Sequence, residues 1–389
     1  MQAPPTPDNE AQRLAELQRA ILDGANYTII SCDANGTIKT FNRAAERLLG
    51  YQAAEVVGRT TAAIFHDPQE VARRAQVLSA ELGRAVAPGF DAFVAKARLG
   101  APDENEWTYI RKDGSRFPVL LSVTALHDGL GAINGFLGIG YDITERREIE
   151  RAKHEFISTV SHELRTPLTS IMGSLGLLAG GIVGAIPPQA KSLIDVAHQN
   201  AQRLVRLIND ILDVDKIESG MLRFEMRCQE LMPQLQQAVD ANRAYAAQFG
   251  VELALEQGTP GVVVEVDGDR MNQVLTNLLS NAAKFSPHGS TVRIGADRSD
   301  GWVCISVADS GSGIPDEFRA RIFQKFAQAD SADARQKGGT GLGLNITKAL
   351  VERMHGTIAF TSSPAAGTTF FVRFPEVSAR PPAPAATGC

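Results

Sequence analysis

Two glycine-rich segments in the last quarter of the 389-residue chain have the composition of phosphate-binding loops: DSGSGIP at 309–315 and GGTGLGL at 338–344. Glycine lets backbone amides approach a phosphate closely, and the N-terminus of a following helix adds the positive end of its dipole. Neither segment has the Gly-Lys-Ser/Thr of a Walker A loop, and neither fits a dinucleotide-binding fingerprint well. Taken alone, each segment is about as typical of a turn as of a nucleotide site.

A polar helix face precedes these loops in NLLSNAAKF, residues 277–285. Asn277, Asn281 and Lys284 recur at i, i+4 and i+7 and therefore share one side of a predicted helix, while apolar residues share another. Amide oxygens suit a hard cation such as Mg²⁺ that keeps some of its waters, and a lysine suits phosphate. For this helix in isolation, an ordinary solvated face is the more common explanation.

The third candidate is His162, in SHELRTPL at 161–168. A neutral imidazole nitrogen is a competent nucleophile toward a phosphoryl group. The adjacent carboxylate of Glu163 can take the proton from the other ring nitrogen and so raise the nucleophilicity. A lone His-Glu pair is usually surface decoration, and by itself it indicates little about function.

The order of these segments changes their meaning. SHELRTPL, NLLSNAAKF, DSGSGIP, IFQKF at 322–326 and GGTGLGLNI at 338–346 follow one another along the chain. In this order and spacing they resemble the H, N, G1, F and G2 boxes of sensor histidine kinases over about residues 145–375, and chance agreement of all five is negligible. The resemblance implies an ATP-dependent protein-histidine kinase of a two-component system, with ATP and Mg²⁺ as its cofactors.

The resemblance implies roles for three residues of the first segment. His162 resembles the phosphoaccepting histidine, and Glu163 resembles its acid/base partner. Thr166 occupies the position that in many members orients water for dephosphorylating the response regulator. Because the nucleotide belongs to the C-terminal domain and the histidine to a helical hairpin, domain movement must bring them together, and a signal can act on that movement.

The other boxes imply a nucleotide site. Asp309 is expected to accept a hydrogen bond from the adenine amino group, and Asn281 to bind Mg²⁺. Charge that builds on the γ-phosphoryl oxygens would be stabilised by Mg²⁺, Lys284 and loop amides. Phe323 and Phe326 are expected to be core aromatics that anchor the ATP lid. The residues expected at the cofactor are Asn277, Asn281, Lys284, Asp309, Gly311, Gly313, Gly339, Thr340, Gly341, Leu342 and Gly343.

The N-terminal third resembles a PAS sensor domain. The resemblance rests on DANG at 33–36, FN at 41–42, LLGY at 48–51, RKDG at 111–114 and the closing GYDIT at 140–144. The cysteine motif of flavin-adduct members is absent. The stretch 99–105, taken as the helix that carries the haem ligand in other members, has no histidine.

The ligand of this PAS domain is unknown from the sequence. His66 and His127 are the remaining histidines of the region, and we expect both to be turn or surface residues. A small apolar ligand, a non-covalent flavin, no ligand at all, and a purely dimerising and protein-binding role stay open.

Periodicity predicts the elements that position the acceptor histidine. A charged run from residue 144 continues as one helix through His162, and Pro167 is expected to kink it. A break at 180–188 separates it from a second amphipathic helix that stops at 219–220. Since one hairpin can hardly cover both apolar seams, we predict a homodimer that forms a four-helix bundle.

The predicted fold is therefore multidomain α+β. A flexible N-terminus with a short helix (1–22) precedes a PAS α/β sensor domain (23–145) and a dimeric helical hairpin for dimerisation and histidine phosphotransfer (146–220). An α/β-sandwich ATP-binding domain of the histidine kinase/Hsp90-like type (221–376) and a flexible tail (377–389) follow.

Composition limits the alternatives. The net charge of −5, from 39 basic and 44 acidic residues, argues against a general nucleic-acid or anionic-membrane binder. Four dispersed cysteines argue against a disulfide scaffold or a zinc site. No stretch approaches the roughly 18 apolar residues of a membrane span, and the N-terminus lacks a secretory pattern. We therefore expect no nucleic-acid partner, no membrane insertion and a cytoplasmic location.

The sequence thus predicts a homodimeric sensor histidine kinase whose PAS domain biases helix packing. ATP–Mg²⁺ would phosphorylate His162, and the phosphoryl group would pass to an aspartate of a separate response regulator. Two alternatives stay open: a net output of regulator dephosphorylation through Thr166, and a catalytically silent scaffold, against which the intact nucleophile, metal and adenine positions argue. The stimulus, the cognate regulator, and cis versus trans phosphorylation also stay open.

Overall fold

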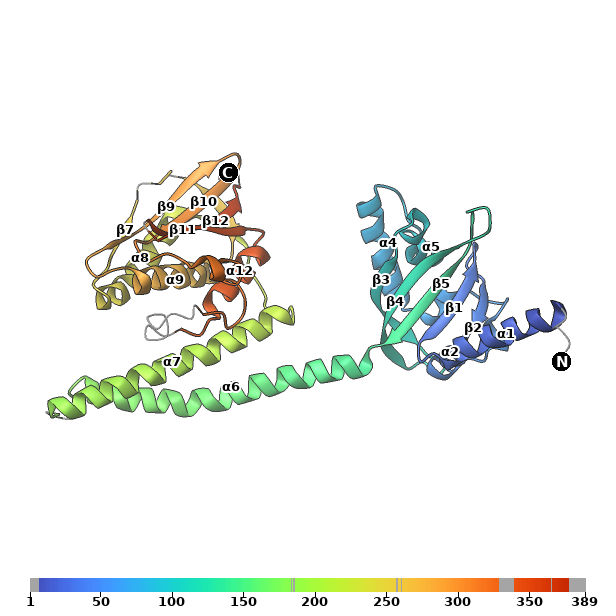
Figure 1. Cartoon of the computed structure of the whole chain (residues 1–389), viewed down its shortest axis with the longest axis horizontal. Coiled ribbons are helices and arrows are strands. Elements are labelled where there is room, and N and C mark those ends of the chain that lie inside the picture. The colour runs from blue at the N-terminus through green and yellow to red at the C-terminus, as the bar shows by residue number, and fades with distance from the viewer. Residues whose placement is uncertain are drawn as a thin grey trace, which may run out of the picture. The chain divides into compact units, whose positions relative to one another are not determined.

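The computed structural model describes residues 7–377 apart from 183, 185, 257, 260, 329–338 and 365. The chain divides into two compact units, Met1–Lys153 and His154–Cys389. Figure 1 shows the elements of both units. Of the predicted flexible ends, 1–22 and 377–389, residues 1–6 and 378–389 lie outside the described residues.

The first unit is built on one antiparallel sheet of five strands in the order β2-β1-β5-β4-β3. The strands are β1 (Thr28–Asp33), β2 (Ile38–Phe41), β3 (Asp103–Ile110), β4 (Arg116–His127) and β5 (Ile133–Asp142). The helices are α1 (Pro7–Gly24), α2 (Arg43–Leu49), α3 (Ala53–Val56), α4 (Pro68–Leu82) and α5 (Phe90–Val94), with two 3₁₀ turns, η1 (Ala62–Phe65) and η2 (Ala97–Leu99).

The turn between β1 and β2 is set by Asp33. Its Oδ1 accepts the N–H groups of Asn35 and Thr37, both at 3.0 Å, and Gly36 takes the left-handed conformation at φ 90°. Alternate residues of β1 are buried, which is the pattern of a strand with one face on a core. The turn joins β1 to β2, which pair antiparallel.

Residues 99–105, expected to be helical, are not. η2 ends at Leu99, Gly100 takes the left-handed conformation at φ 78°, and β3 begins at Asp103. Gly100 and Pro102 explain the difference, because glycine ends helices in this conformation and proline disfavours helix in the residue before it. Because residues 99–105 do not form a helix, their lack of histidine does not show whether a helix of this unit carries a haem ligand. Helices α4 and α5 also contain no histidine.

The second unit begins within the long helix α6 (Thr144–Ala179), which a short connection joins to α7 (Pro188–Glu218). Both ends of the connection agree with the predicted break. α6 stays helical through Pro167, whose missing N–H leaves the carbonyl of Glu163 without its usual helical donor.

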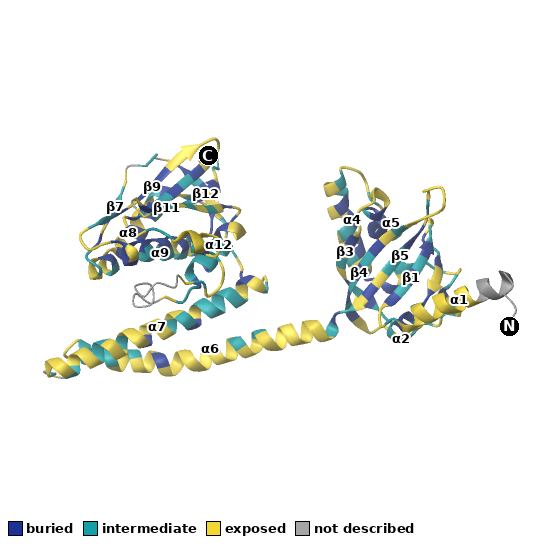
Figure 2. Ribbon diagram, in the orientation of Figure 1, coloured by how far each residue is buried: buried dark blue, intermediate teal, exposed yellow. Residues whose placement is uncertain are grey.

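The hairpin buries little of its own apolar surface, as the exposed faces of α6 in Figure 2 show. Exposed large apolar side chains lie on both helices: Ile149, Phe156, Val160, Leu164, Ile171 and Leu177 on α6, and Leu193, Val196 and Leu204 on α7. We call these residues the apolar seam. Exposed apolar side chains spaced along two helices are what a helical bundle buries.

The rest of the second unit, which we call the C-terminal lobe, packs helices on one side of a five-stranded sheet of order β11-β12-β10-β9-β7 (Figure 1). Its strands are β6 (Arg227–Glu230), β7 (Glu252–Leu255), β8 (Val263–Val266), β9 (Thr291–Ser299), β10 (Trp302–Ala308), β11 (Thr357–Ser363) and β12 (Gly367–Pro375), with β6 and β8 paired separately. Its helices are α8 (Leu231–Gln248), α9 (Gly268–Phe285), α10 (Asp316–Arg319) and α12 (Gly343–Arg353).

Helix α9 lies at the centre of the lobe's core. Its N-cap residue Asp267 accepts the N–H groups of Asp269 and Arg270. Its apolar face, including Leu278 and Ala282, is buried in one cluster with alternate residues of β9 and β10. Each such leucine contributes about 1.5–3 kcal/mol, so the core fixes which way the polar face of α9 points. In the part of the chain that the structure describes, no helix is both long and apolar enough to cross a membrane.

Candidate active site

Asp309 follows the last residue of β10, and its side chain is almost completely buried. Oδ1 accepts hydrogen bonds from the N–H groups of Gly311 at 2.8 Å and Thr368 at 3.1 Å. Burial raises the pKa of this carboxyl, and the two backbone bonds oppose the shift. Oδ2 takes no hydrogen bond from any described residue, so it can accept one from a ligand N–H group such as the adenine amino group.

Three positions near Asp309 are glycines, and a side chain at any of them would collide with neighbouring atoms. A Cβ on Gly311 would lie 2.9 Å from Asp309 Oδ1, and one on Gly313, which has φ 78°, would lie 2.8 Å from the Ser363 backbone. The sequence did not single out Gly367, yet a Cβ there would meet the Asp309 carbonyl oxygen at 2.1 Å. Its only sequence signal is a glycine where a regular strand begins.

Asn277, Asn281 and Lys284 lie on the polar side of α9, as their spacing predicts. Asn277 Nδ2 donates to the Gly343 carbonyl and to Thr347 Oγ1, both at 3.4 Å, and so ties α9 to the start of α12. Lys284 is 9% exposed. The Asn281 side chain is half-buried and makes no hydrogen bond within the described residues.

The glycine loop, residues Gly339–Gly343, leads into α12. A Cβ on Gly339 would lie 3.2 Å from Lys284 Nζ, and Gly341, at φ 71°, leaves no room for a side chain against the Phe326 backbone. Leu342 is fully buried and is the N-cap residue of α12. The loop therefore presents backbone amides and a buried lysine at the positive end of an 11-residue helix, where anions bind well.

This donor set fits a nucleoside triphosphate with a hard cation. Asp309 offers an acceptor for an adenine amino group, the glycine loop and Lys284 offer positive potential for phosphates, and Asn281 offers an amide oxygen for Mg²⁺. No group of three or more His, Cys, Asp or Glu side chains suited to a metal occurs among the residues that the structure describes. Phosphate oxygens and water would therefore complete the coordination of a Mg²⁺ ion on Asn281.

His162 projects from α6 into solvent. Its side chain is 75% exposed, and its Nδ1 lies 3.7 Å from Glu163 Oε1. The Thr166 hydroxyl, one turn further along, donates to the His162 carbonyl at 3.4 Å. A carboxylate near Nδ1 favours the tautomer that keeps the lone pair on Nε2, which is the arrangement of an activated nucleophile.

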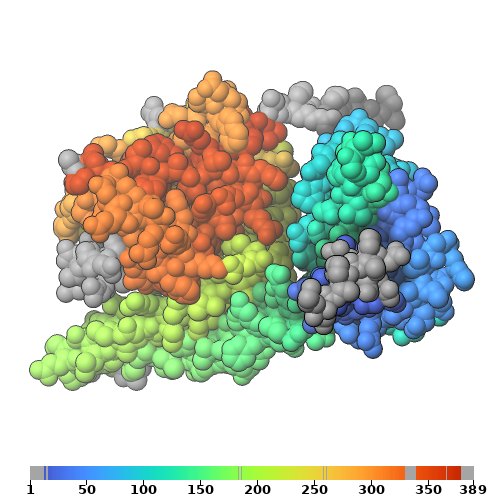
Figure 3. Space-filling view, turned by 45° about the vertical axis from the view of Figure 1, so that its right-hand side comes forward, coloured from blue at the N-terminus to red at the C-terminus, as the bar shows by residue number. Residues whose placement is uncertain are grey.

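Acidic residues of α7, which the sequence did not single out, contact the C-terminal lobe. Figure 3 shows the yellow-green α7 segment against the orange and red atoms of the lobe. The contacts are Asp210 Oδ2 with Thr340 Oγ1 at 2.7 Å, Asp213 Oδ2 with Gln273 Nε2 at 2.7 Å, and the ion pair of Glu218 with Lys325. The sequence carries no signal for these contacts, because carboxylates are ordinary on the polar face of an amphipathic helix.

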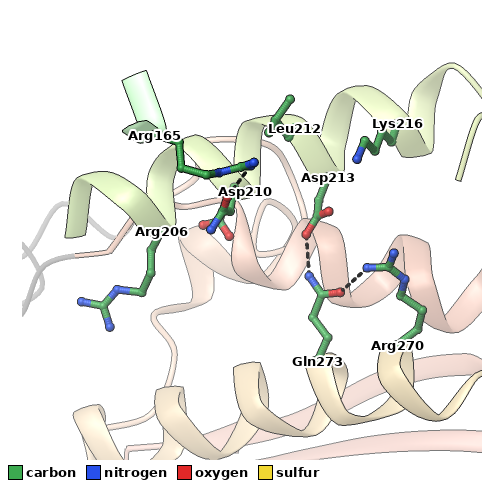
Figure 4. A pocket seen from close by; sticks show the side chains of 9 residues that line it. Arg165, Arg206, Asp210, Leu212, Asp213, Lys216, Arg270 and Gln273 are labelled. Carbon is green, nitrogen blue, oxygen red and sulfur yellow. Dashed lines mark hydrogen bonds between the residues drawn. The ribbon is translucent and has the colours of Figure 1, made fainter. Parts of the chain in front are cut away.

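A pocket of about 370 Å³ opens beside these contacts. Figure 4 shows cationic side chains from three helices around it: Arg165 of α6, Arg206 and Lys216 of α7, and Arg270 of α9. Gln273 of α9 connects the lobe to the hairpin, because its Nε2 donates to Asp213 of α7, and its Oε1 accepts from Arg270 of its own helix at 3.1 Å. At this pocket the hairpin and the lobe meet through charged and amide groups, while Ile211, Val214 and Ile217 of α7 pack on the apolar core of the lobe.

His66 is a core residue, so the expectation of a turn or surface residue is wrong. It is 3% exposed, and its ring centroid lies 4.1 Å from that of Phe93 and 4.9 Å from that of Tyr109. An isolated antiparallel β-bridge pairs His66, just after η1, with Tyr109 of β3, and this pairing explains why His66 is buried. His127, at the end of β4, is exposed as expected.

The two phenylalanines of IFQKF differ. Phe323 packs on the core of the lobe, with its ring centroid 6.0 Å from that of Phe360, which fits the expected anchor. Phe326 is 64% exposed, so its assignment as a core aromatic is wrong. It has φ 58°, a turn conformation in which its backbone, rather than its ring, lies against Gly341.

Three family models match the chain in consecutive segments. They are the PAS domain over residues 26–145, the His Kinase A (phospho-acceptor) domain over 152–220, and the Histidine kinase-, DNA gyrase B-, and HSP90-like ATPase over 266–378. The matches fall on the sheet of the first unit, on the hairpin that carries His162, and on the part of the lobe that carries Asp309 and the glycine loop.

Two curated proteins and one solved structure are similar to between 58% and 95% of this chain. The Virulence sensor protein BvgS of Bordetella bronchiseptica is 33% identical over 398 residues, covering 95% of this chain and 31% of that protein. The Circadian input-output histidine kinase CikA of Synechococcus elongatus is 39% identical over 227 residues, covering 58% of this chain and 30% of that protein. The solved structure of full-length ShkA in complex with AMPPNP matches with a TM-score of 0.49 and 29% identity, over 59% of this chain and 47% of that one.

The chain spans about a third of the length of these two curated relatives. Its three matched domains nevertheless follow one another in a single order, with the histidine on the matched hairpin and the nucleotide-type site on the matched lobe. The chain therefore belongs to the PAS-domain-containing sensor histidine kinases.

Proposed function

We propose that this chain is an ATP-dependent protein-histidine kinase that phosphorylates its own His162 and passes the phosphoryl group to an aspartate of a separate response regulator. One observation carries the proposal. A preformed nucleotide-type site at Asp309 and the glycine loop occurs in the same unit as an exposed histidine that has a carboxylate beside it.

The lobe's residues bind and orient the nucleotide. Asp309 Oδ2 accepts the adenine amino group, while Oδ1 stays held by two backbone N–H groups. Lys284 and the amides of the glycine loop face the phosphates. Mg²⁺ held by Asn281 would neutralise charge on the phosphate oxygens, which is the main need of phosphoryl transfer.

The hairpin's residues carry out the attack. The lone pair of His162 Nε2 forms the bond to the γ-phosphorus, while the bond from that phosphorus to the bridging oxygen breaks and ADP leaves with the electron pair. Glu163 takes the proton of Nδ1, so the phosphorylated imidazole carries no extra positive charge. Because His162 is so exposed, the lobe must approach it before this geometry exists.

We propose a second copy of the chain as the partner that covers the apolar seam. Nine large apolar side chains of the two helices are exposed in the single chain. A dimer that buried them would form a four-helix bundle in which the PAS domains act on helix packing through α6. Sedimentation of the full chain, with Phe156→Glu as the disrupting variant, measures this assembly.

Radiolabelled ATP tests the kinase proposal directly. We expect an acid-labile, base-stable label on the wild-type chain and none on His162→Gln, with the affinity for AMPPNP–Mg²⁺ unchanged. His127→Gln, which alters an exposed histidine at the end of β4, is the matched control and should label normally. Label that persists in His162→Gln would refute the assignment of the acceptor.

A second candidate output is dephosphorylation of the regulator. The observation that favours it is the Thr166 hydroxyl, which is exposed one turn from His162 and makes only a long bond of 3.4 Å. Such a hydroxyl can hold a water beside a phosphoryl group docked at His162.

A further inference from the structure

Asp210 of α7 ties the glycine loop to the hairpin. Its Oδ2 accepts the hydroxyl proton of Thr340 at 2.7 Å, and the same hydroxyl oxygen accepts the N–H of Leu342 at 3.2 Å. Leu342 is the N-cap residue of α12. The Thr340 hydroxyl therefore links a carboxylate of the hairpin to the N-terminus of α12, where the nucleotide phosphates are expected to bind.

Asp210 is partly buried beside charges of both signs, with Arg165 and Arg206 lining the same pocket. Partial burial raises the pKa of the Asp210 carboxyl; Thr340 and Arg206 counter the shift, and the nearby Asp213 adds to it. The dipole of α12 and the hydroxyl of Thr340 are the groups that compensate on the side of the lobe. A triphosphate at the same helix terminus would face this carboxylate with like charge.

We propose that Asp210 is a positioning residue that competes with the nucleotide's phosphates for the N-terminus of α12, so that docking of Asp210 on Thr340 and tight nucleotide binding exclude one another. The inference rests on the proposed function, since it requires that the glycine loop bind phosphate. Repacking of the hairpin that withdraws Asp210 then raises nucleotide affinity, which connects the position of α7 to the loading of the lobe.

Other contacts between α7 and the lobe allow charge competition to be separated from simple docking. Asp213 bonds Gln273 in the first half of α9, and Glu218 pairs with Lys325. Neither contact includes a residue of the glycine loop. Asp213→Asn therefore removes a charge from the same helix face while it leaves the Asp210–Thr340 contact and the N-terminus of α12 as they are.

The test measures binding of AMPPNP–Mg²⁺ to the full chain by calorimetry for Asp210→Asn, Asp210→Ala, Asp213→Asn and Asp195→Asn. Asp210→Asn removes the charge but keeps an oxygen that can accept from Thr340, whereas Asp210→Ala removes both. Asp195, a half-buried carboxylate of α7 without a hydrogen bond or ion pair in the described part of the chain, is the matched control.

We expect both Asp210 variants to bind AMPPNP–Mg²⁺ about three- to tenfold more tightly, with a smaller gain at high salt, as for a charge effect at a helix terminus. The KM for ATP in autophosphorylation should fall by the same factor, while the rate at saturating ATP changes by less than about twofold. Asp195→Asn should be unchanged, and Asp213→Asn should have a smaller effect than Asp210→Asn.

Three results would overturn the inference: unchanged or weaker binding in Asp210→Asn, a gain in Asp210→Ala alone, or an equal gain in Asp213→Asn. Its failure can be told from failure of the proposed function. Normal AMPPNP binding with no label on His162 refutes the kinase and leaves the competition intact, whereas equal affinities with normal labelling refute only the competition. If no variant binds AMPPNP, both proposals fail.

Discussion

The candidate site has polar groups that are buried in the C-terminal lobe and polar groups that are exposed on the hairpin. In the lobe, Asp309 and Lys284 are almost fully buried, and backbone bonds and glycines fix the carboxylate. On the hairpin, His162 and Glu163 are exposed and make one long contact with each other. The difference teaches that a site for a small ligand can be preorganised by the fold, whereas a group that must meet other domains in turn has to remain accessible.

Two histidines sharpen this contrast. His162 is open to solvent, while His66 is enclosed by aromatic rings in the core of the first unit. His66 Nδ1 lies 2.9 Å from the Ala62 carbonyl, and Nε2 has no partner among the described residues. The same side chain is thus exposed, at the position proposed for the nucleophile, in one region and is a buried packing group in the other.

The largest effect is expected from Glu163→Gln. If the exposed carboxylate takes the Nδ1 proton, its loss should slow phosphorylation of His162 by about 10²- to 10⁴-fold at saturating ATP. The affinity for AMPPNP–Mg²⁺ should not change, because Glu163 belongs to the hairpin. Glu155→Gln, on the same exposed helix, is the control. A wild-type rate in Glu163→Gln would show that an exposed pair with a long contact does no proton transfer.

Acid should destabilise the first unit through His66. Burial lowers its pKa from 6.5 to about 4, so the native state holds the neutral form. The unfolded state gains the proton first as the pH falls, and stability is therefore lost between pH 6.5 and 4, by about 3 kcal/mol.

The measurement for His66 is unfolding followed through Trp107 in a Trp302→Phe background. His66→Phe should remove most of the slope between pH 6.5 and 4, since phenylalanine does not titrate. An equal slope in both proteins would mean that His66 is not held neutral by the core.

A smaller effect is expected from Asp309→Asn. An amide in place of the carboxylate cannot accept two backbone N–H bonds and an adenine N–H as strongly, so we expect AMPPNP–Mg²⁺ to bind about 10- to 100-fold more weakly. Calorimetry measures the change, with Asp316→Asn on the exposed helix α10 as the control. Unchanged affinity would show that burial of Asp309 serves the fold alone.

The smallest effect on the kinase reaction is expected from Thr166→Ala. The hydroxyl makes only a long bond to its own helix, so phosphorylation of His162 should stay within about twofold of wild type. Dephosphorylation of a phosphorylated regulator should slow markedly if Thr166 holds the attacking water. A strong loss of autophosphorylation would instead place Thr166 in the transfer step.

Local patterns were the ones that the sequence predicted well. The i, i+4, i+7 spacing placed Asn277, Asn281 and Lys284 on one face of α9, because helical period depends only on neighbouring residues. A side chain at Gly311 or Gly313 would meet neighbouring protein atoms, and the predicted close approach of a nucleotide to these two glycines stays a prediction. By contrast, the burial of His66 depends on a bridge to a strand more than forty residues away, which no local pattern reveals.

The sequence by itself determined the domain order, the helix faces and the chemical identity of the candidate site, since these follow from residue type and short-range spacing. Only the tertiary structure decided which polar side chains are buried and which are exposed. It alone also shows that Asp210 contacts Thr340, which lies 130 positions further along the chain. The physical reason is that contacts between distant segments depend on how whole elements pack, and a carboxylate on a helix gives no local sign of the loop it will meet.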